Sequence, residues 1–174
     1  MPFMSPLPSQ PPLPHAARHL LCLGNALHGD DGLGPALAQA LLAAPQLLPA
    51  DVRVFELGTR GLDGLALFEG CRQVLLIDAC EPRGQPGRIW QGSAADLLSQ
   101  WQVLFGSAPT EHGGGLGFLL RAAASLEAGP EVEVILLEAQ QLRAFSPGLS
   151  AAVRAALPAL IARIQAALEP AHVL

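Results

Sequence analysis

Charged side chains are scarce in this sequence of 174 residues: they make up 14% of the chain, against about 25% in an average soluble protein. No cluster of basic residues is present, and the formal net charge is −5. Proteins bind nucleic acids and anionic lipids through basic clusters, so the composition argues against both as the main partner. The thin charged coat on a chain that is 51% hydrophobic is a weak sign of a surface for a partner.

Cysteine is also rare, and Cys22, Cys71 and Cys80 show no zinc-binding spacing. An odd number of cysteines without a secretory signal is typical of reduced thiols in a reducing compartment. The N-terminus has no basic segment followed by an apolar run, and no apolar stretch approaches the roughly 20 residues that a membrane helix needs. We therefore expect a cytoplasmic protein with no membrane association.

Proline is concentrated at the N-terminus, where six prolines fall within the first 14 residues. Proline fixes φ and removes a hydrogen-bond donor, so such a segment forms neither a helix nor a central strand. We expect residues 1–18 to be a disordered extension and residues 19–174 to form a single α/β domain, because a chain of this length suits one domain.

Short apolar runs alternate with helical patterns through the rest of the chain. Strands are expected at 19–23, 52–57, 73–77 and 132–137, with a weaker edge strand at 88–91. Helices are expected at 32–44, 62–69, 93–103 with Ser93 as the cap, 116–126 and 149–168, the last with a kink or a break at Pro158. This alternation predicts a three-layer α/β/α sandwich with a mostly parallel sheet of about five strands and one antiparallel edge strand.

The segment from Gly24 to Gly34, GNALHGDDGLG, leaves the first expected strand and enters the first expected helix. In a doubly wound sheet this position places Asp30 and Asp31 at the carboxyl edge, where such folds bind ligands. A phosphate-binding turn is the alternative, but the spacing fits neither common nucleotide motif and carboxylates repel phosphate. We expect Asp31 to be a metal ligand and Asp30 to be a helix cap or a solvated residue.

A further aspartate, Asp78, ends the apolar run at 73–77, where a charge is unfavourable unless it is paired or coordinated. If the first and third strands are neighbours, Asp78 lies beside Asp31. Two carboxylates about 5 Å apart repel by roughly 3 kcal/mol at an effective dielectric constant of 20, so the pair needs a shared proton or a cation. The DTG-type setting of the aspartic-protease dyad is absent, which favours a divalent metal, with capping of the next turn as the structural alternative.

A glycine-rich segment, EHGGGLG at residues 111–117, places His112 just before an expected helix and toward the same edge. A single histidine is more often structural, but one imidazole and two carboxylates suit nickel, zinc, cobalt or iron. Three ligands also leave coordination positions open, as catalytic and transient sites require. Among the other histidines His28 is the nearest to this site and suits a supporting contact.

Four ordered motifs resemble those of the maturation endopeptidases of nickel–iron hydrogenases. Residues 24–34 match the family's G-N-x-L-x-x-D-[DE]-G-x-G signature, 58–61 its G-T-x-G stretch, 78–79 its strand ending in D-A, and 112–116 its histidine–glycine segment opening a helix. The resemblance covers about residues 20–168. It implies that Asp31, Asp78 and His112 contact the metal, the three residues that fold geometry also favours.

The resemblance implies an enzyme, a peptidase that removes a short C-terminal extension from a hydrogenase large-subunit precursor after nickel insertion. The nickel would be supplied by the precursor, and no organic cofactor is implied. Asn25, Gly58 and Thr59 are expected to shape the groove that receives the precursor's tail. Activation of water by the metal or by a carboxylate stays open, and no serine or cysteine lies in a setting that would support an acyl-enzyme.

Three features depart from the family pattern: the proline-rich start, His28-Gly29 before the acidic pair, and Cys80, whose thiolate is a less favoured additional ligand. The main alternative function is a non-catalytic metal carrier that docks on the precursor and does not shorten it. A hydrolase of peptidyl-tRNA would need a basic cleft, which this acidic sequence does not offer. A monomer is expected, because no amphipathic element is left unassigned.

Overall fold

The computed structural model describes residues 17–105, 115–126 and 128–169. Within them a single sheet is formed by β1 (Ala17–Leu23), β2 (Val52–Gly58), β3 (Cys71–Cys80), β4 (Ile89–Ser93) and β5 (Glu131–Glu138). The strand order is β2-β1-β3-β5-β4, and the pairs are parallel except for the antiparallel pair of β4 with β5. The predicted mostly parallel sheet with one antiparallel edge strand is confirmed.

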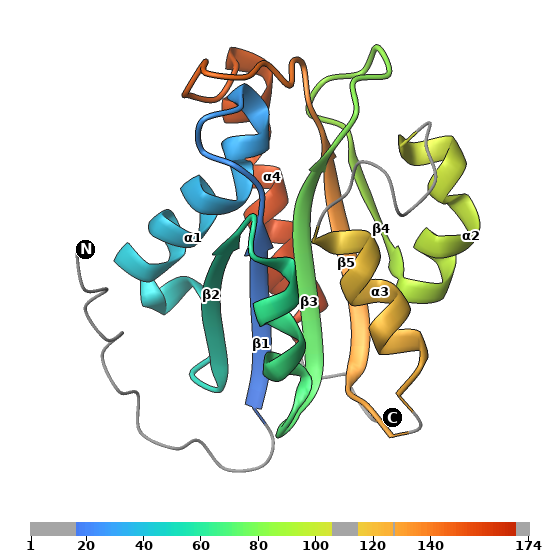
Figure 1. Cartoon of the computed structure of the whole chain (residues 1–174). Coiled ribbons are helices and arrows are strands. Elements are labelled where there is room, and N and C mark those ends of the chain that lie inside the picture. The colour runs from blue at the N-terminus through green and yellow to red at the C-terminus, as the bar shows by residue number, and fades with distance from the viewer. Residues whose placement is uncertain (1–16, 106–114, 127, 170–174) are drawn as a thin grey trace, which may run out of the picture.

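Helices cover both faces of the sheet (Figure 1). One face carries α1 (Leu33–Ala43) and α4 (Ala151–Ala167), and the other carries α2 (Ala94–Phe105), α3 (Leu116–Ala124) and the 3₁₀-helix η3 (Gly61–Phe68). Two shorter 3₁₀-helices, η1 (Gly29–Gly32) and η2 (Pro45–Leu47), lie before and after α1. The three-layer sandwich is therefore confirmed. Among the described residues, none of the helices has the length and apolar character needed to span a bilayer.

Strand β3 lies between β1 and β5 and is covered on both faces, which explains its continuous apolar run. Successive side chains of a strand point to opposite faces. Leu75 and Ile77 accordingly pack on the side of α1 and α4, whereas Val74 and Leu76 pack on the side of α2 and α3. By the same alternation Asp78 belongs to the face that carries α3.

Two local predictions had different outcomes. Ser93 caps α2 as expected, since its Oγ accepts a hydrogen bond from the Asp96 N–H at 3.1 Å and Asp96 Oδ2 accepts one from the Ser93 N–H at 3.1 Å. Of the predicted kink or break at Pro158, the break is wrong, because α4 runs through the proline without interruption. Val153 on one side of the proline and Leu160 on the other are both buried in the same core cluster, and such packing can override the local preference of proline.

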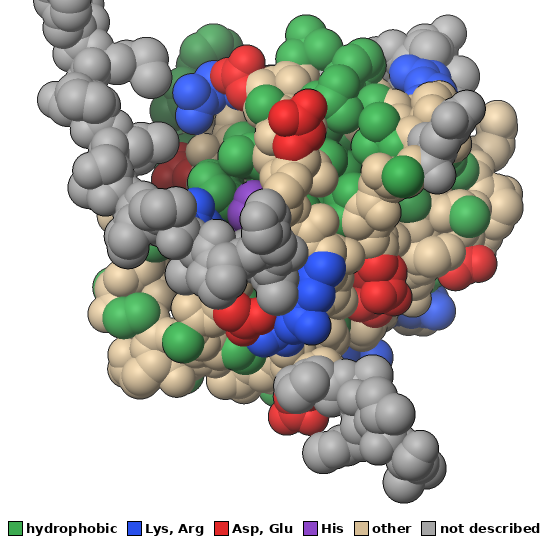
Figure 2. All heavy atoms as spheres, turned by 90° about the horizontal axis from the view of Figure 1, so that it is seen from below, with side chains coloured by type: hydrophobic (Ala, Val, Ile, Leu, Met, Phe, Trp, Pro, Cys, Tyr) green, Lys and Arg blue, Asp and Glu red, His purple; other side chains and the backbone are tan. Residues whose placement is uncertain are grey.

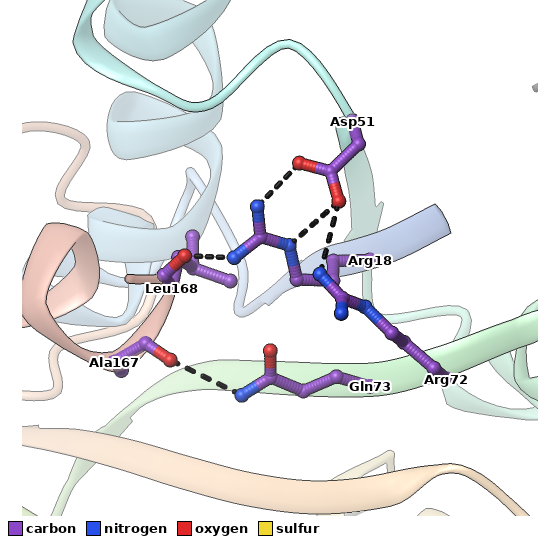
Figure 3. A network of polar contacts seen from close by, with 6 residues as sticks. All are labelled: Arg18, Asp51, Arg72, Gln73, Ala167 and Leu168. Atoms are coloured by element: carbon purple, nitrogen blue, oxygen red, sulfur yellow. Dashed lines mark hydrogen bonds and ion pairs between the residues drawn. The ribbon is translucent and has the colours of Figure 1, made fainter. Parts of the chain in front are cut away.

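The C-terminal end of α4 is bound to the amino ends of the strands by polar contacts (Figure 3). The guanidinium of the buried Arg18 donates to the Leu168 carbonyl and to both carboxylate oxygens of Asp51, with an Nε–Oδ2 distance of 3.0 Å. Gln73 Nε2 donates to the Ala167 carbonyl at 3.1 Å. These bonds satisfy carbonyl groups that the end of a helix leaves without intrahelical partners.

Asp51→Asn is expected to lower the free energy of unfolding at pH 7 by about 1–2 kcal/mol. Breaking a fully buried ion pair costs roughly 3–5 kcal/mol, but the pair of Asp51 with Arg18 is worth less because Asp51 is partly exposed. Acidic and basic side chains are neighbours at this end of the molecule (Figure 2), and Arg72 lies 3.2 Å from Asp51 as a second cation. The hydrogen bond from Arg18 holds the pKa of Asp51 below its ordinary value.

A carboxylate with a lowered pKa stabilises the fold above its unfolded pKa, and that stabilisation is lost as the pH falls through the folded pKa. Urea unfolding at pH 7 and at pH 3 checks this, with Asp63→Asn on the exposed surface of η3 as the control. If Asp51→Asn lowers the free energy of unfolding as much at pH 3 as at pH 7, the charge of Asp51 is not the source of the stabilisation.

Candidate functional site

The turn between β1 and α1 positions Asp31 at the carboxyl edge of the sheet. Gly24 has a φ of 127°, and a Cβ atom there would lie 2.0 Å from the Asp31 carbonyl oxygen. The Asn25 N–H donates to that same oxygen at 2.9 Å, and the Gly24 N–H donates to the Gly58 carbonyl at 3.1 Å. The backbone can therefore close this turn only with glycine at position 24, and the closure holds Asp31 above the end of β1.

Asp31 and Asp78 lie close enough to interact electrostatically. Strands β1 and β3 are parallel neighbours, and Cys22 lies opposite Ile77. The two strands therefore end at the same place on the carboxyl edge of the sheet. Burial raises the pKa of Asp78 to about 8, with the charge of Asp31 as the second cause. Burial also raises the pKa of Asp31, with the charge of Glu81 adding to it, while His28 and the backbone of Asn25 lower it.

Asp78 does not cap a turn. Strand β3 continues past Asp78 to Cys80. Oδ1 of Asp78 accepts a hydrogen bond from the N–H of the next residue, Ala79, at 2.8 Å. A carboxyl group with a pKa near neutrality releases its proton readily when a cation arrives, and two adjacent carboxylates then become a favourable pair of oxygen ligands.

His112 lies outside the described residues, but the segment that follows it is placed. A Cβ atom on Gly61 would lie 2.1 Å from the Cα of Gly115, and one on Gly115 would lie 2.7 Å from Leu23 Cδ2. The start of α3 therefore packs against both the end of β1 and the G-T-x-G turn. In the described part of the chain, no group of three or more His, Cys, Asp or Glu side chains is arranged to hold a metal ion.

Asp30 is neither a helix cap nor solvated, contrary to the prediction. It is fully buried, and its carboxylate accepts hydrogen bonds from the backbone N–H groups of Gln140 at 2.8 Å, Gln141 at 3.1 Å and Ser150 at 2.6 Å. Burial works to raise the pKa of Asp30, but these hydrogen bonds outweigh it and hold the pKa below its ordinary value. Asp30 thus binds the loop between β5 and α4 to the turn that carries Asp31.

Asp30→Asn is expected to lower the free energy of unfolding by about 2–3 kcal/mol at pH 7, because the new NH₂ group faces backbone donors and leaves a buried N–H unsatisfied. Glu138→Gln is a matched control, since Glu138 is buried too but accepts from the Arg83 N–H and the Gln85 N–H through the same oxygen, Oε1. An amide can preserve that arrangement. Equal losses in the two variants, measured by urea unfolding, would contradict this account of Asp30.

A groove of about 530 Å³ lies next to the turn that carries Asp31, between α1, the end of β2 and the loop before α4. Its lining is mostly apolar and comprises Ala26, Gly32, Pro35, Ala36, Gln39, Leu42, Glu56, Gly148 and Leu149. The residues predicted to shape a groove lie in the adjoining turns: Asn25 Oδ1 accepts from the Leu27 N–H at 3.0 Å, Gly58 has a φ of 53°, and Thr59 is exposed.

Sequence reasoning did not single out Glu56, which is one of the residues that line this groove. In the sequence it occupies a polar position of an alternating strand, where a solvated side chain is the ordinary interpretation. Glu56 comes two residues before Gly58, which was predicted to shape the groove, and this closeness in sequence was the one sign that Glu56 could lie near the groove.

The thiols do not suit catalysis. Burial raises the pKa of both Cys22 and Cys80 to about 12, and it also raises the pKa of Cys71. The nucleophile and metal ligand is the thiolate, which such groups seldom form at neutral pH. Cys80 packs in the core on the side of α2 and α3, which disfavours the interpretation of its sulfur as an additional ligand.

Comparison with known proteins identifies similar chains. A model of the family described as hydrogenase maturation protease (HycI) matches residues 36–167, a stretch that includes Asp78 and His112 and begins after Asp31. The hydrogenase 3 maturation protease of Escherichia coli (strain K12) is 28% identical over 95 residues, which are 53% of this chain and 59% of that protein. The matched stretch thus spans less than two thirds of that relative.

Solved structures share the fold. The hydrogenase 2 maturation peptidase from Thaumarchaeota archaeon SCGC_AB-539-E09 is 30% identical, with 88% of this chain and 98% of that chain covered and a TM-score of 0.61. The hydrogenase maturating endopeptidase HybD from E. coli is 20% identical, with 87% and 91% covered and a TM-score of 0.69, and this likeness shows the fold alone.

Proposed function

This chain belongs to the hydrogenase maturation protease family, and we propose that it is an endopeptidase that removes the C-terminal extension of a nickel-loaded hydrogenase large-subunit precursor. The observation that carries the proposal is the pair formed by Asp31 and Asp78. Burial and mutual repulsion raise the pKa of Asp78 to about 8, and a bound cation would relieve that repulsion. The precursor's nickel is such a cation.

We propose that Asp31, Asp78 and His112 contact nickel that the precursor already holds, so that the ion is part of the substrate. Gly115 is packed against Leu23 at the end of β1. His112 comes three positions before Gly115 in the sequence, and three residues span at most about 11 Å. The side chain of Asp78 belongs to the face that carries α3, and His112 precedes α3. No organic cofactor and no resident metal are needed in this scheme.

The contact with nickel would hold the scissile peptide bond next to the two carboxylates. Water would then attack the carbonyl carbon, with either the nickel or a carboxylate promoting its deprotonation. The C–N bond would break as the leaving amine takes up a proton, which gives a new carboxylate on the precursor and a free amine on the tail. The tail of the precursor would lie in the groove beside α1, with Asn25, Gly58 and Thr59 shaping its entrance. We further propose that the chain acts as a monomer and as a single domain, in the cytoplasm. The domain begins at Ala17 and not at residue 19, because Ala17 and the buried Arg18 belong to β1.

The direct test compares nickel-loaded and nickel-free precursor. We expect mass spectrometry to show shortening of the nickel-loaded precursor only. Equal cutting of both forms would indicate a general peptidase, and binding without shortening would indicate the alternative function, a metal carrier.

A further inference from the structure

Two exposed apolar side chains, those of Leu27 and Phe145, lie on adjacent loops at the carboxyl edge. The exposed fraction is 55% for Leu27 and 88% for Phe145. Their loops are joined by backbone hydrogen bonds: the Ser146 N–H donates to the Leu27 carbonyl at 3.1 Å, and the Gly29 N–H donates to the Ser146 carbonyl at 2.9 Å. The turn after β1 and the loop before α4 lie together at the top of Figure 1.

The backbone at Phe145 is strained. Its φ is 54°, and among the described residues Phe145 is the only residue other than glycine with a positive φ. Bulky L-residues rarely adopt this left-handed region, because Cβ crowds the following carbonyl. An exposed aromatic ring adds nothing to the core either. Two unfavourable features at one residue indicate that its position serves something other than stability.

The loop that carries Phe145 is anchored at both ends by one buried carboxylate. Its two ends donate backbone hydrogen bonds to the same carboxylate, that of Asp30, from Gln140 and Gln141 at one end and from Ser150 at the other. The Asp30 N–H in turn donates to the Gln141 carbonyl at 3.1 Å. Because Asp30 directly precedes Asp31, the loop is fixed relative to the proposed nickel-contacting residue.

We propose that Phe145 and Leu27 form a surface that binds an apolar segment of the precursor close to the bond to be cut; this rests on the proposed function. The surface is continuous with the site, since Leu27 belongs to the turn that carries Asp31. Carboxylates can recognise the metal but offer an apolar polypeptide little affinity. A second copy of this chain is disfavoured as the occupant, because it would cover Asp31 and block the precursor.

The test measures KM and kcat for processing of nickel-loaded precursor by variants of Phe145. Phe145→Ala and Phe145→Gly are expected to raise KM roughly tenfold or more with little change in kcat, because burial of a Phe ring is worth about that much in affinity. Phe145→Leu should stay within a fewfold of wild type. Glycine also relieves the backbone strain, so Phe145→Gly is expected to have a higher Tm than Phe145→Ala.

Leu27→Ser provides a second, independent variant with the same expected rise in KM. Val103→Ala, which alters a side chain on α2 that is 65% exposed, is the control and should behave as wild type. An unchanged KM in both Phe145→Ala and Leu27→Ser would overturn the proposal.

Binding of the precursor to immobilised protein separates this proposal from the proposed function. If wild type binds the precursor without cutting it, the endopeptidase function fails, and a tenfold weaker binding by Phe145→Ala still supports the surface. Equal binding by wild type and Phe145→Ala overturns the surface alone. Absence of binding by wild type overturns both.

Discussion

Asp78→Asn is expected to abolish processing of the nickel-loaded precursor, with a loss of at least about 100-fold in rate, typical of the removal of one group that stabilises charge at a reacting centre. Asparagine has nearly the same shape as aspartate, but it lacks the negative charge that is proposed to contact nickel. Asp31→Asn is expected to cause a loss of similar size. The initial rate of shortening of the large subunit, followed by mass spectrometry, measures both.

The control for charge removal is Asp63→Asn, which alters an exposed carboxylate on η3 whose ion pair with Arg60 spans 3.8 Å. It should process the precursor at the wild-type rate. Circular dichroism of Asp78→Asn is expected to match wild type, because the strand and its neighbours are preserved. Processing at the wild-type rate by folded Asp78→Asn would refute the metal-contact role.

The same substitution is expected to stabilise the protein at alkaline pH. The pKa of Asp78 is raised from 3.8 to about 8, so between these values the folded state holds a proton that the unfolded state has released. The stability of wild type therefore falls as the pH rises through this window. A pKa shift of one unit corresponds to about 1.4 kcal/mol. Because the side chain of Asp78 is only partly buried, only part of the shift is expected to affect stability. We expect the free energy of unfolding of Asp78→Asn to exceed that of wild type by about 1–3 kcal/mol at pH 8.5.

Urea unfolding of wild type and Asp78→Asn at pH 5 and pH 8.5 measures this gain. The difference between the two proteins should grow with pH, because asparagine does not ionise. A difference that is the same at both pH values, or a variant that is less stable at pH 8.5, would show that Asp78 is not held in the protonated form. Together with the loss of processing, the expected gain would identify Asp78 as a residue retained for function at the expense of stability.

Much of the fold follows from local sequence. The apolar run around Leu75 and Ile77 indicates a strand covered on both faces, and β3 is such a strand, although it begins two residues earlier and ends three residues later than predicted. The proximity of Asp31 and Asp78 was also predictable, because residues that follow neighbouring parallel strands meet at one edge. A charge at the end of a buried strand was the strongest signal.

Other features depend on contacts that a sequence does not reveal. The partners of Asp30 lie 110 or more positions away, so its buried role as an anchor for a distant loop could not be read from the motif. The positive φ of Phe145 has no local signature, because this residue type seldom adopts it. The continuity of α4 across Pro158 reflects packing on both sides of the proline, which overrides its local preference.

The central claim, that two carboxylates and one imidazole converge on nickel, is tested most directly by anomalous diffraction at the nickel edge from crystals of this protein exposed to nickel ions. We predict one ion with a carboxylate oxygen of Asp31, a carboxylate oxygen of Asp78 and a ring nitrogen of His112 at about 2.0–2.2 Å, the range for such ligands on a comparable divalent metal. An ion bound elsewhere, or bound at this edge without any one of the three, would contradict the account.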